Sequence, residues 1–152
     1  MSRPNHLSHL TEAVRLAMEN RRRGARPFGA VLAQGDRIVT TGVNDMLDSK
    51  DPSSHAEMNA LRAAGSALGR TDLSGCIVYA SGHPCPMCLA ALVLANVDAV
   101  YYAFGNDEAE PYGYSTAGVY RRLGITLAPP PLPLERLDVG MSPAQLYGTS
   151  HD

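Results

Sequence analysis

The sequence carries little net charge. Thirteen Lys and Arg residues against fifteen Asp and Glu residues leave a formal charge of −2 at pH 7, and the isoelectric point is near 6.2. A domain that binds nucleic acid usually has a clear basic excess, so this balance argues against such a partner. One local basic run, Arg21 to Arg23 with Arg26, is better explained as a solvated helix C-terminus than as a phosphate-binding patch, because cations suit that end of the helix dipole.

Cysteines and long apolar runs are also scarce. The three cysteines are an odd number and two of them form a C-x-x-C pair, which argues against a disulfide framework and for thiols in a reducing compartment. The longest apolar stretch, Leu89 to Val97, is far shorter than the roughly 20 residues of a membrane span. The polar segment Met1 to Asn5 lacks the apolar core of a signal peptide. We therefore expect a soluble, cytoplasmic protein with no membrane association.

The order of predicted elements indicates an α/β fold. With 152 residues, 45% of them hydrophobic, the chain has the size and composition of one globular domain covering residues 1–152. Apolar periodicity and turn residues predict helices at 7–24, 54–68, 85–96 and 115–123, strands at 29–33, 38–43, 76–80, 99–104 and 125–127, and polar loops at 45–53 and 105–113. A hairpin followed by alternating helices and buried strands predicts a three-layer sandwich, a mixed sheet of about five strands with helices on both faces. The proline-rich start of segment 129–152 predicts an extended segment, followed by one helical turn capped by Ser142.

Two short motifs contain the ligands of a metal site. His55 lies at the start of one predicted helix, and Cys85 and Cys88 lie on one face at the start of another. One histidine and two cysteines suit Zn²⁺, and three protein ligands leave a fourth position for water, which is typical of a catalytic zinc site. Glu57 lies beside these ligands without being needed as a fourth.

Each of these residues also has an ordinary explanation. The C-x-x-C pair could be a redox motif, and Ser54-x-x-Glu57 fits a capping box in which the glutamate bonds back to the cap. A structural zinc site would need a fourth protein ligand. Cys76 is a poor candidate, because the strand between it and Cys85 separates them by about 15 Å. His83 would need a strained chelate to bind the same ion. We therefore expect the fourth coordination position of the zinc ion to stay open for water.

The conjunction of H-x-E with P-C-x-x-C is the pattern of zinc-dependent nucleobase deaminases. The chain also has Pro27-Phe28-Gly29-Ala30-Val31-Leu32, Gly42-Val43-Asn44, Asp51-Pro52-x-x-His55-Ala56-Glu57-Met58-Asn59-Ala60-Leu61-Arg62 and Pro84-Cys85-Pro86-Met87-Cys88-Leu89-Ala90-Ala91. These motifs resemble the cytidine deaminase-like superfamily, and within it the branch of guanine, cytosine and tRNA adenosine deaminases. The resemblance extends from the first helix to about Phe104.

The resemblance implies a role for each candidate residue. His55, Cys85 and Cys88 would bind Zn²⁺, which lowers the pKa of its bound water and yields hydroxide as the nucleophile. Glu57 would move protons between water, ring and departing amine. The resemblance also implies substrate contacts at Asn44, Phe28, Ala56 and Tyr114.

Departures from the family pattern bear on the substrate. His83 replaces the glutamate often found before the Pro-Cys pair. The acidic pair of guanine deaminases is absent from Gly113-Tyr114-Ser115-Thr116, although Glu110 could substitute for it. The basic C-terminal helix of tRNA-acting relatives is absent as well.

These features favour hydrolytic deamination of a small nucleobase or nucleoside, with a guanine-like purine ahead of cytosine or cytidine. The alternatives are adenosine-to-inosine deamination of tRNA and a non-catalytic structural zinc module. The resemblance also implies a homodimer in which segment 129–152 can be exchanged between subunits. The stiff stretch from Pro129 to Pro133 could project Tyr147 or His151 across the partner's site.

Overall fold

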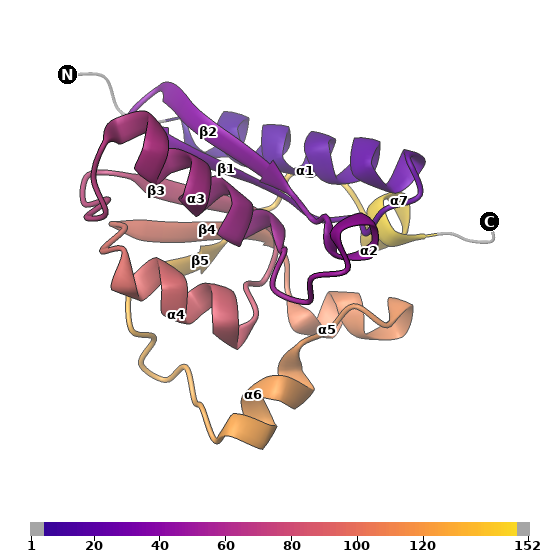
Figure 1. Ribbon diagram of the computed structural model, residues 1–152. Helices are drawn as coiled ribbons and strands as arrows, with labels where there is room; N and C mark the ends of the chain where they lie inside the picture. Colours follow the sequence, from indigo (N-terminus) through magenta and orange to yellow (C-terminus); the bar gives the residue numbers. More distant parts are fainter. Residues whose placement is uncertain (1–4, 149–152) are drawn as a thin grey trace.

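The computed structural model describes residues 5–148, which form a mixed five-stranded sheet between two layers of helices (Figure 1). The elements along the chain are α1 (His6–Arg22), β1 (Gly29–Gln34), β2 (Arg37–Val43), α2 (Met46–Ser49), α3 (Ala56–Leu68), β3 (Ile77–Gly82), α4 (Pro86–Leu94), β4 (Ala99–Phe104), α5 (Asn106–Ala109), the 3₁₀ helix η1 (Glu110–Tyr112), α6 (Ala117–Leu123), β5 (Leu134–Arg136) and α7 (Pro143–Tyr147). The predicted three-layer α/β sandwich is confirmed.

The strand order β2-β1-β3-β4-β5 joins an antiparallel hairpin to a parallel half-sheet. β1 pairs antiparallel with both β2 and β3, whereas β3, β4 and β5 run parallel. Gly82 at the end of β3 lies opposite Phe104 at the end of β4. The chain therefore leaves both strands at the same edge of the sheet, which is where open α/β sheets bind ligands.

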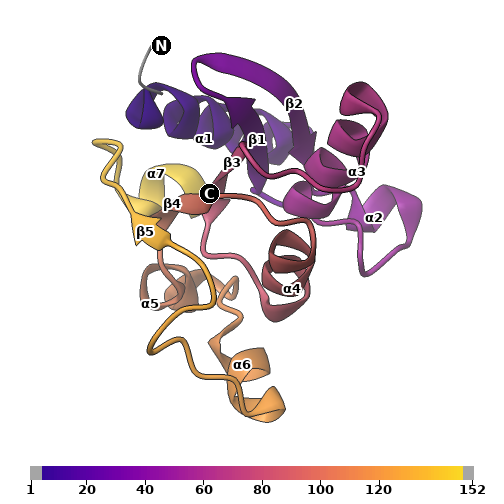
Figure 2. The same cartoon turned by 90° about the vertical axis from the view of Figure 1, so that its left-hand side faces the viewer.

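Side chains alternate between the two faces of the sheet and build two cores. On β1, Val31 and Ala33 pack with α1, and Ala30 and Leu32 belong to the cluster that includes α3 and α4. Figures 1 and 2 show α1 and α7 covering one face and α3 and α4 covering the other. Because β1 is buried on both sides, it reads as a continuous apolar run in the sequence.

Several predicted boundaries were wrong. The loops expected at 45–53 and 105–113 contain the short helices α2, α5 and η1. The last strand is Leu134–Arg136 rather than 125–127, which has no regular structure. The reason is spatial: α6 projects away from the sheet (Figure 2), so the residues that follow it cannot reach β4, whereas Leu134 pairs with Val100.

No helix within residues 5–148 is long and apolar enough to cross a membrane.

One close approach determines where α3 lies. A Cβ atom on Gly42 of β2 would stand 2.3 Å from the Ala56 carbonyl oxygen and 2.6 Å from the Ala60 nitrogen. Real Cβ atoms do not come this close to backbone atoms, so only glycine lets α3 lie against β2 at this point.

We expect Gly42→Ala to destabilise the protein by about 3 kcal/mol or more, because the contact is with backbone that cannot move aside cheaply. Urea unfolding measures the change. Gly65→Ala is the matched control: it lies inside α3, its nearest neighbouring atom is 3.5 Å from the added methyl group, and we expect about 0.5–1 kcal/mol of stabilisation. Equal effects of the two substitutions would contradict the argument.

Candidate active site

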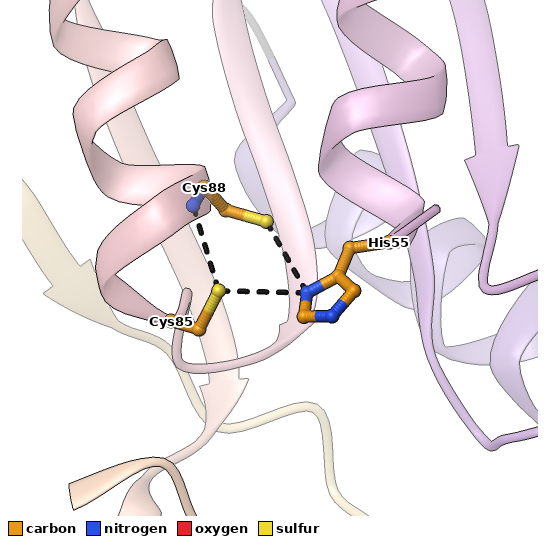
Figure 3. A group of neighbouring side chains, drawn as sticks. All are labelled: His55, Cys85 and Cys88. Atoms are coloured by element: carbon orange, nitrogen blue, oxygen red, sulfur yellow. Dashed lines mark hydrogen bonds between the residues drawn. The ribbon is translucent and has the colours of Figure 1, made fainter. Parts of the chain in front are cut away.

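The three predicted ligands converge on one point between α3 and α4. The Nδ1 atom of His55 lies 3.4 Å from the Cys85 sulfur and 3.5 Å from the Cys88 sulfur, and all three ligand atoms lie within 4.8 Å of one another (Figure 3). A tetrahedral Zn²⁺ with ordinary bond lengths separates a nitrogen and a sulfur ligand by about 3.6 Å. Among residues 5–148 no other group of three His, Cys, Asp or Glu side chains has this spacing. The donor set and its distances fit Zn²⁺.

Two helix N-termini place these ligands. His55 is the N-cap residue of α3, and Cys85 is the N-cap residue of α4. The Cys85 sulfur accepts a hydrogen bond of 3.5 Å from the Cys88 backbone N–H. A helix N-terminus favours the thiolate over the thiol, and the thiolate is the form that binds metal.

The two thiols have pKa values shifted in opposite directions. The hydrogen bond from Cys88 lowers the pKa of Cys85 to about 4, with a further contribution from His55, whereas the same hydrogen bond and burial raise the pKa of Cys88. One thiolate is therefore ready at neutral pH, and metal binding would displace the second proton.

Glu57 does not serve as a helix cap. The helix begins after His55, so Ser54 precedes the cap, and its N–H donates to the Asp51 carbonyl oxygen at 3.1 Å. The Ser54 hydroxyl oxygen accepts from Asn59 Nδ2 at 3.1 Å. The capping-box explanation of Ser54-x-x-Glu57 was therefore wrong.

The Glu57 side chain is instead buried next to the thiols. Its residue is 8% exposed, and burial raises its pKa from an ordinary 4.5 to about 7. The nearby Cys85 charge raises this pKa further, whereas His55 and a hydrogen bond with Cys88 lower it. A carboxyl group that can hold or release a proton near neutrality is suited to proton transfer.

Neither Cys76 nor His83 belongs to the ligand group, and Cys76 lies in the core as predicted. Cys76, just before β3, is fully buried in the core cluster with Val78 and Val97 and does not belong to the ligand group. His83 is turned toward the Pro84 carbonyl oxygen, 2.9 Å from its Nδ1 atom, and contacts Tyr102 and Tyr120 edge-on. Burial lowers the pKa of His83, which favours the neutral imidazole.

A pocket of about 150 Å³ opens beside the ligand cluster. The predicted substrate residues Phe28, Asn44, Ala56 and Tyr114 all line it, together with Glu57, His55 and Cys85. An apolar cavity of about this size can hold a single aromatic ring.

Backbone contacts hold the polar wall of the pocket in place. Asn44 is 4% exposed, and its Oδ1 accepts a hydrogen bond from the Met46 N–H at 3.1 Å. Its backbone carbonyl accepts from Asn20 Nδ2 at 2.9 Å, and its N–H donates to the Phe28 carbonyl at 3.2 Å. With one hydrogen bond on Oδ1, the Asn44 amide can still donate through its N–H groups and accept through the second lone pair of Oδ1.

Phe28 and Tyr114 line the pocket and belong to an aromatic cluster from three parts of the chain. The Phe28 ring meets the Tyr114 ring edge-on at 5.5 Å between centroids, and Tyr147 packs against both rings. Tyr147 comes from α7 of the same chain, so the partner is not needed to bring it here. His151 lies outside the described residues, and exchange of the C-terminal segment stays a prediction.

Sequence reasoning missed part of the lining. Arg26, Met46, Ser115 and Thr116 also face the pocket, so Arg26 is not only the solvated helix-end cation that the basic run predicted. Glu110 is exposed and absent from the lining. The only sequence signal for Arg26 was its place directly before Pro27-Phe28.

Comparison with known proteins agrees with this geometry. Residues 3–104 match the family described as the cytidine and deoxycytidylate deaminase zinc-binding region, and the chain belongs to this family. It is an enzyme of the class that hydrolyses C–N bonds.

Individual relatives span two branches of the family. Guanine deaminase of Bacillus subtilis is 40% identical over 120 residues, which cover 78% of this chain and 77% of that one. Its crystal structure gives a TM-score of 0.76 at 36% identity, covering 90% of this chain and 87% of the other. The tRNA-specific adenosine deaminase of Aquifex aeolicus is 35% identical over 94 residues, 62% of each chain.

We expect Cys85→Ser to weaken zinc binding by more than about 100-fold, because it removes a ligand outright rather than a supporting contact. Metal content after dialysis against a chelator measures this. Cys76→Ala, which changes the third cysteine in the core, should keep one zinc per chain. Zinc retained by Cys85→Ser, or lost from both variants, would contradict the assigned ligand set.

Burial of Glu57 also predicts a pH-dependent stability of the metal-free protein. Because the native pKa of about 7 exceeds the ordinary 4.5, the folded state binds more protons between these values, and its stability falls as pH rises through them. Glu57→Gln removes this ionisation. In chelator, we expect the variant to gain stability relative to wild type between pH 5 and pH 8, as measured by urea unfolding. A difference independent of pH would show that Glu57 is not titrating in this range.

Proposed function

We propose that this protein is a zinc-dependent hydrolase that removes an amino group from a small nucleobase-like heterocycle. The observation that supports this most directly is the position of the buried Glu57 carboxyl group. It lies beside the three-ligand cluster and lines a pocket of the size of one ring.

His55 Nδ1 and the two thiolates would hold the zinc ion, which when bound supplies Lewis-acid activation of water. Glu57 accepts a proton from the attacking water and delivers it to the ring nitrogen next to the reacting carbon. A carbon–oxygen bond forms. Glu57 then takes the proton of the new hydroxyl group and passes it to the departing amine, as the carbon–nitrogen bond breaks and the carbonyl forms. Water and the amino-heterocycle are consumed, and a carbonyl compound and ammonia are produced.

The other lining residues hold the ring. Asn44 presents amide N–H donors to acceptors on the edge of the ring, while one lone pair of its oxygen accepts from the Met46 N–H. Phe28 and Tyr114 supply apolar surface and exclude water.

The small pocket and the near-neutral charge favour a free base or nucleoside over tRNA. The Bacillus subtilis relative acts on guanine, as its name states. A guanine-like purine or a related heterocycle is therefore the first candidate, with cytosine next. Deamination of tRNA adenosine is the alternative, supported by the relatives of that branch.

Ammonia release from zinc-loaded protein, measured over guanine, cytosine, adenine and their nucleosides, tests the proposal. Glu57→Ala should lower kcat by about 10²- to 10⁴-fold while zinc content stays at the wild-type level. Glu110→Ala, which removes an exposed carboxylate outside the pocket, is the matched control and should be neutral. Turnover of no small substrate, with inosine formed in tRNA instead, would replace this proposal with the alternative.

A further inference from the structure

Arg26 stands on a fixed piece of backbone at the edge of the pocket. Its carbonyl oxygen accepts two hydrogen bonds of 2.8 Å, one from Asn20 Nδ2 and one from the Phe28 N–H. Asn20 is itself buried and also bonds the Asn44 carbonyl. The same amide therefore ties Arg26 to the residue that contacts the ring edge, and the position of Arg26 relative to the ring is set by the fold.

The guanidinium group of Arg26 has no partner among residues 5–148. No ion pair or side-chain hydrogen bond to it occurs in this part of the chain. Arg26 lines the same pocket as the metal ligands His55 and Cys85. Arginine at this depth usually has an anionic partner, because a partly desolvated charge gains much from pairing.

The rest of the lining supplies no such partner. Among residues 5–148, Glu57 is the only acid that lines the pocket, and it is buried. Ser115 and Thr116 also line the pocket. The Ser115 hydroxyl accepts from the Ala117 N–H, and the Thr116 hydroxyl and N–H both donate to Asn106 Oδ1. These side chains are neutral. In the part of the lining away from Glu57, the charge therefore comes from Arg26.

We propose that Arg26 is a specificity-determining residue that binds a carboxylate or phosphate group on the substrate, so that the preferred substrate is an anionic amino-heterocycle. This inference rests on the proposed function and refines it.

Size and geometry support this arrangement. The pocket holds about one ring, and Arg26 is only partly buried, so a substituent on the ring would extend toward Arg26 at the rim. Guanidinium binds carboxylate and phosphate through two parallel N–H···O bonds, which lysine or glutamine cannot reproduce. A neutral purine such as guanine would leave this group unpaired.

The test compares matched substrates that differ only in charge. For the carboxylate arm we use 5-carboxycytosine against 5-carbamoylcytosine, and for the phosphate arm the 5′-monophosphates of cytidine and guanosine against the nucleosides. In wild type we expect the anionic member of at least one arm to have the higher kcat/KM. Arg26→Gln should reduce that anionic-to-neutral ratio by about 10- to 100-fold, the range of a charge-assisted pair.

Arg22→Gln is the matched control, because it removes the same charge from an exposed position of α1 outside the pocket. The anionic-to-neutral ratio of kcat/KM in Arg22→Gln should equal that of wild type. The substrate pair whose ratio falls in Arg26→Gln shows whether the acidic group is a carboxylate or a phosphate. Equal ratios in wild type, Arg26→Gln and Arg22→Gln in both arms would overturn the inference while leaving deamination intact.

A binding measurement separates this inference from the proposed function. Calorimetry of 5-carboxyuracil and uridine 5′-monophosphate against the zinc-loaded protein needs no turnover. Affinity that falls at least tenfold in Arg26→Gln, but not in Arg22→Gln, would support the anion subsite even if no substrate were deaminated. Binding of both compounds unchanged by Arg26→Gln would overturn it.

Discussion

The active site depends on the close packing of α3 against β2. Gly42 allows the Ala56 carbonyl and the Ala60 nitrogen to lie where a side chain would otherwise stand. His55 and Glu57 flank Ala56 in the first turn of α3, so this contact decides how far they reach toward α4. A shift of a few tenths of an ångström here would move the imidazole away from both sulfurs, and metal ligation tolerates little error in distance.

Burial then gives the site its chemistry. The same packing that excludes water from Glu57 raises its pKa, and the hydrogen bond from the Cys88 side chain lowers the pKa of Cys85, with smaller contributions from His55 and the Cys88 backbone N–H. One environment thus produces an acid that keeps its proton longer and a thiol that loses it sooner. The two pKa shifts have different causes: desolvation is the largest cause for Glu57, whereas a hydrogen bond to the charged form is the largest cause for Cys85.

The cluster of His55, Cys85 and Cys88 could be predicted from the sequence because the spacing of short motifs indicated it. Cys85 and Cys88 share a helix face by their spacing, and Cys76 was excluded by the length of β3. Ser54 shows the limit of such rules: its spacing to Glu57 matched a capping box, but the loop before α3 used its N–H for Asp51 instead. The prediction of the last strand was wrong for a related reason. The position of α6 in space, rather than the apolar residues after it, decides which segment pairs with β4.

The sequence by itself determined the residue types of the centre, the order of helices and strands, and the family, because these follow from local periodicity and from motifs a few residues long. Only the tertiary structure decided which other side chains share the pocket. Arg26, Met46 and Thr116 are separated by long stretches of chain, and Tyr147 reaches Phe28 and Tyr114 from the opposite end of the sequence. Their meeting depends on the packing of whole elements, which no local pattern encodes.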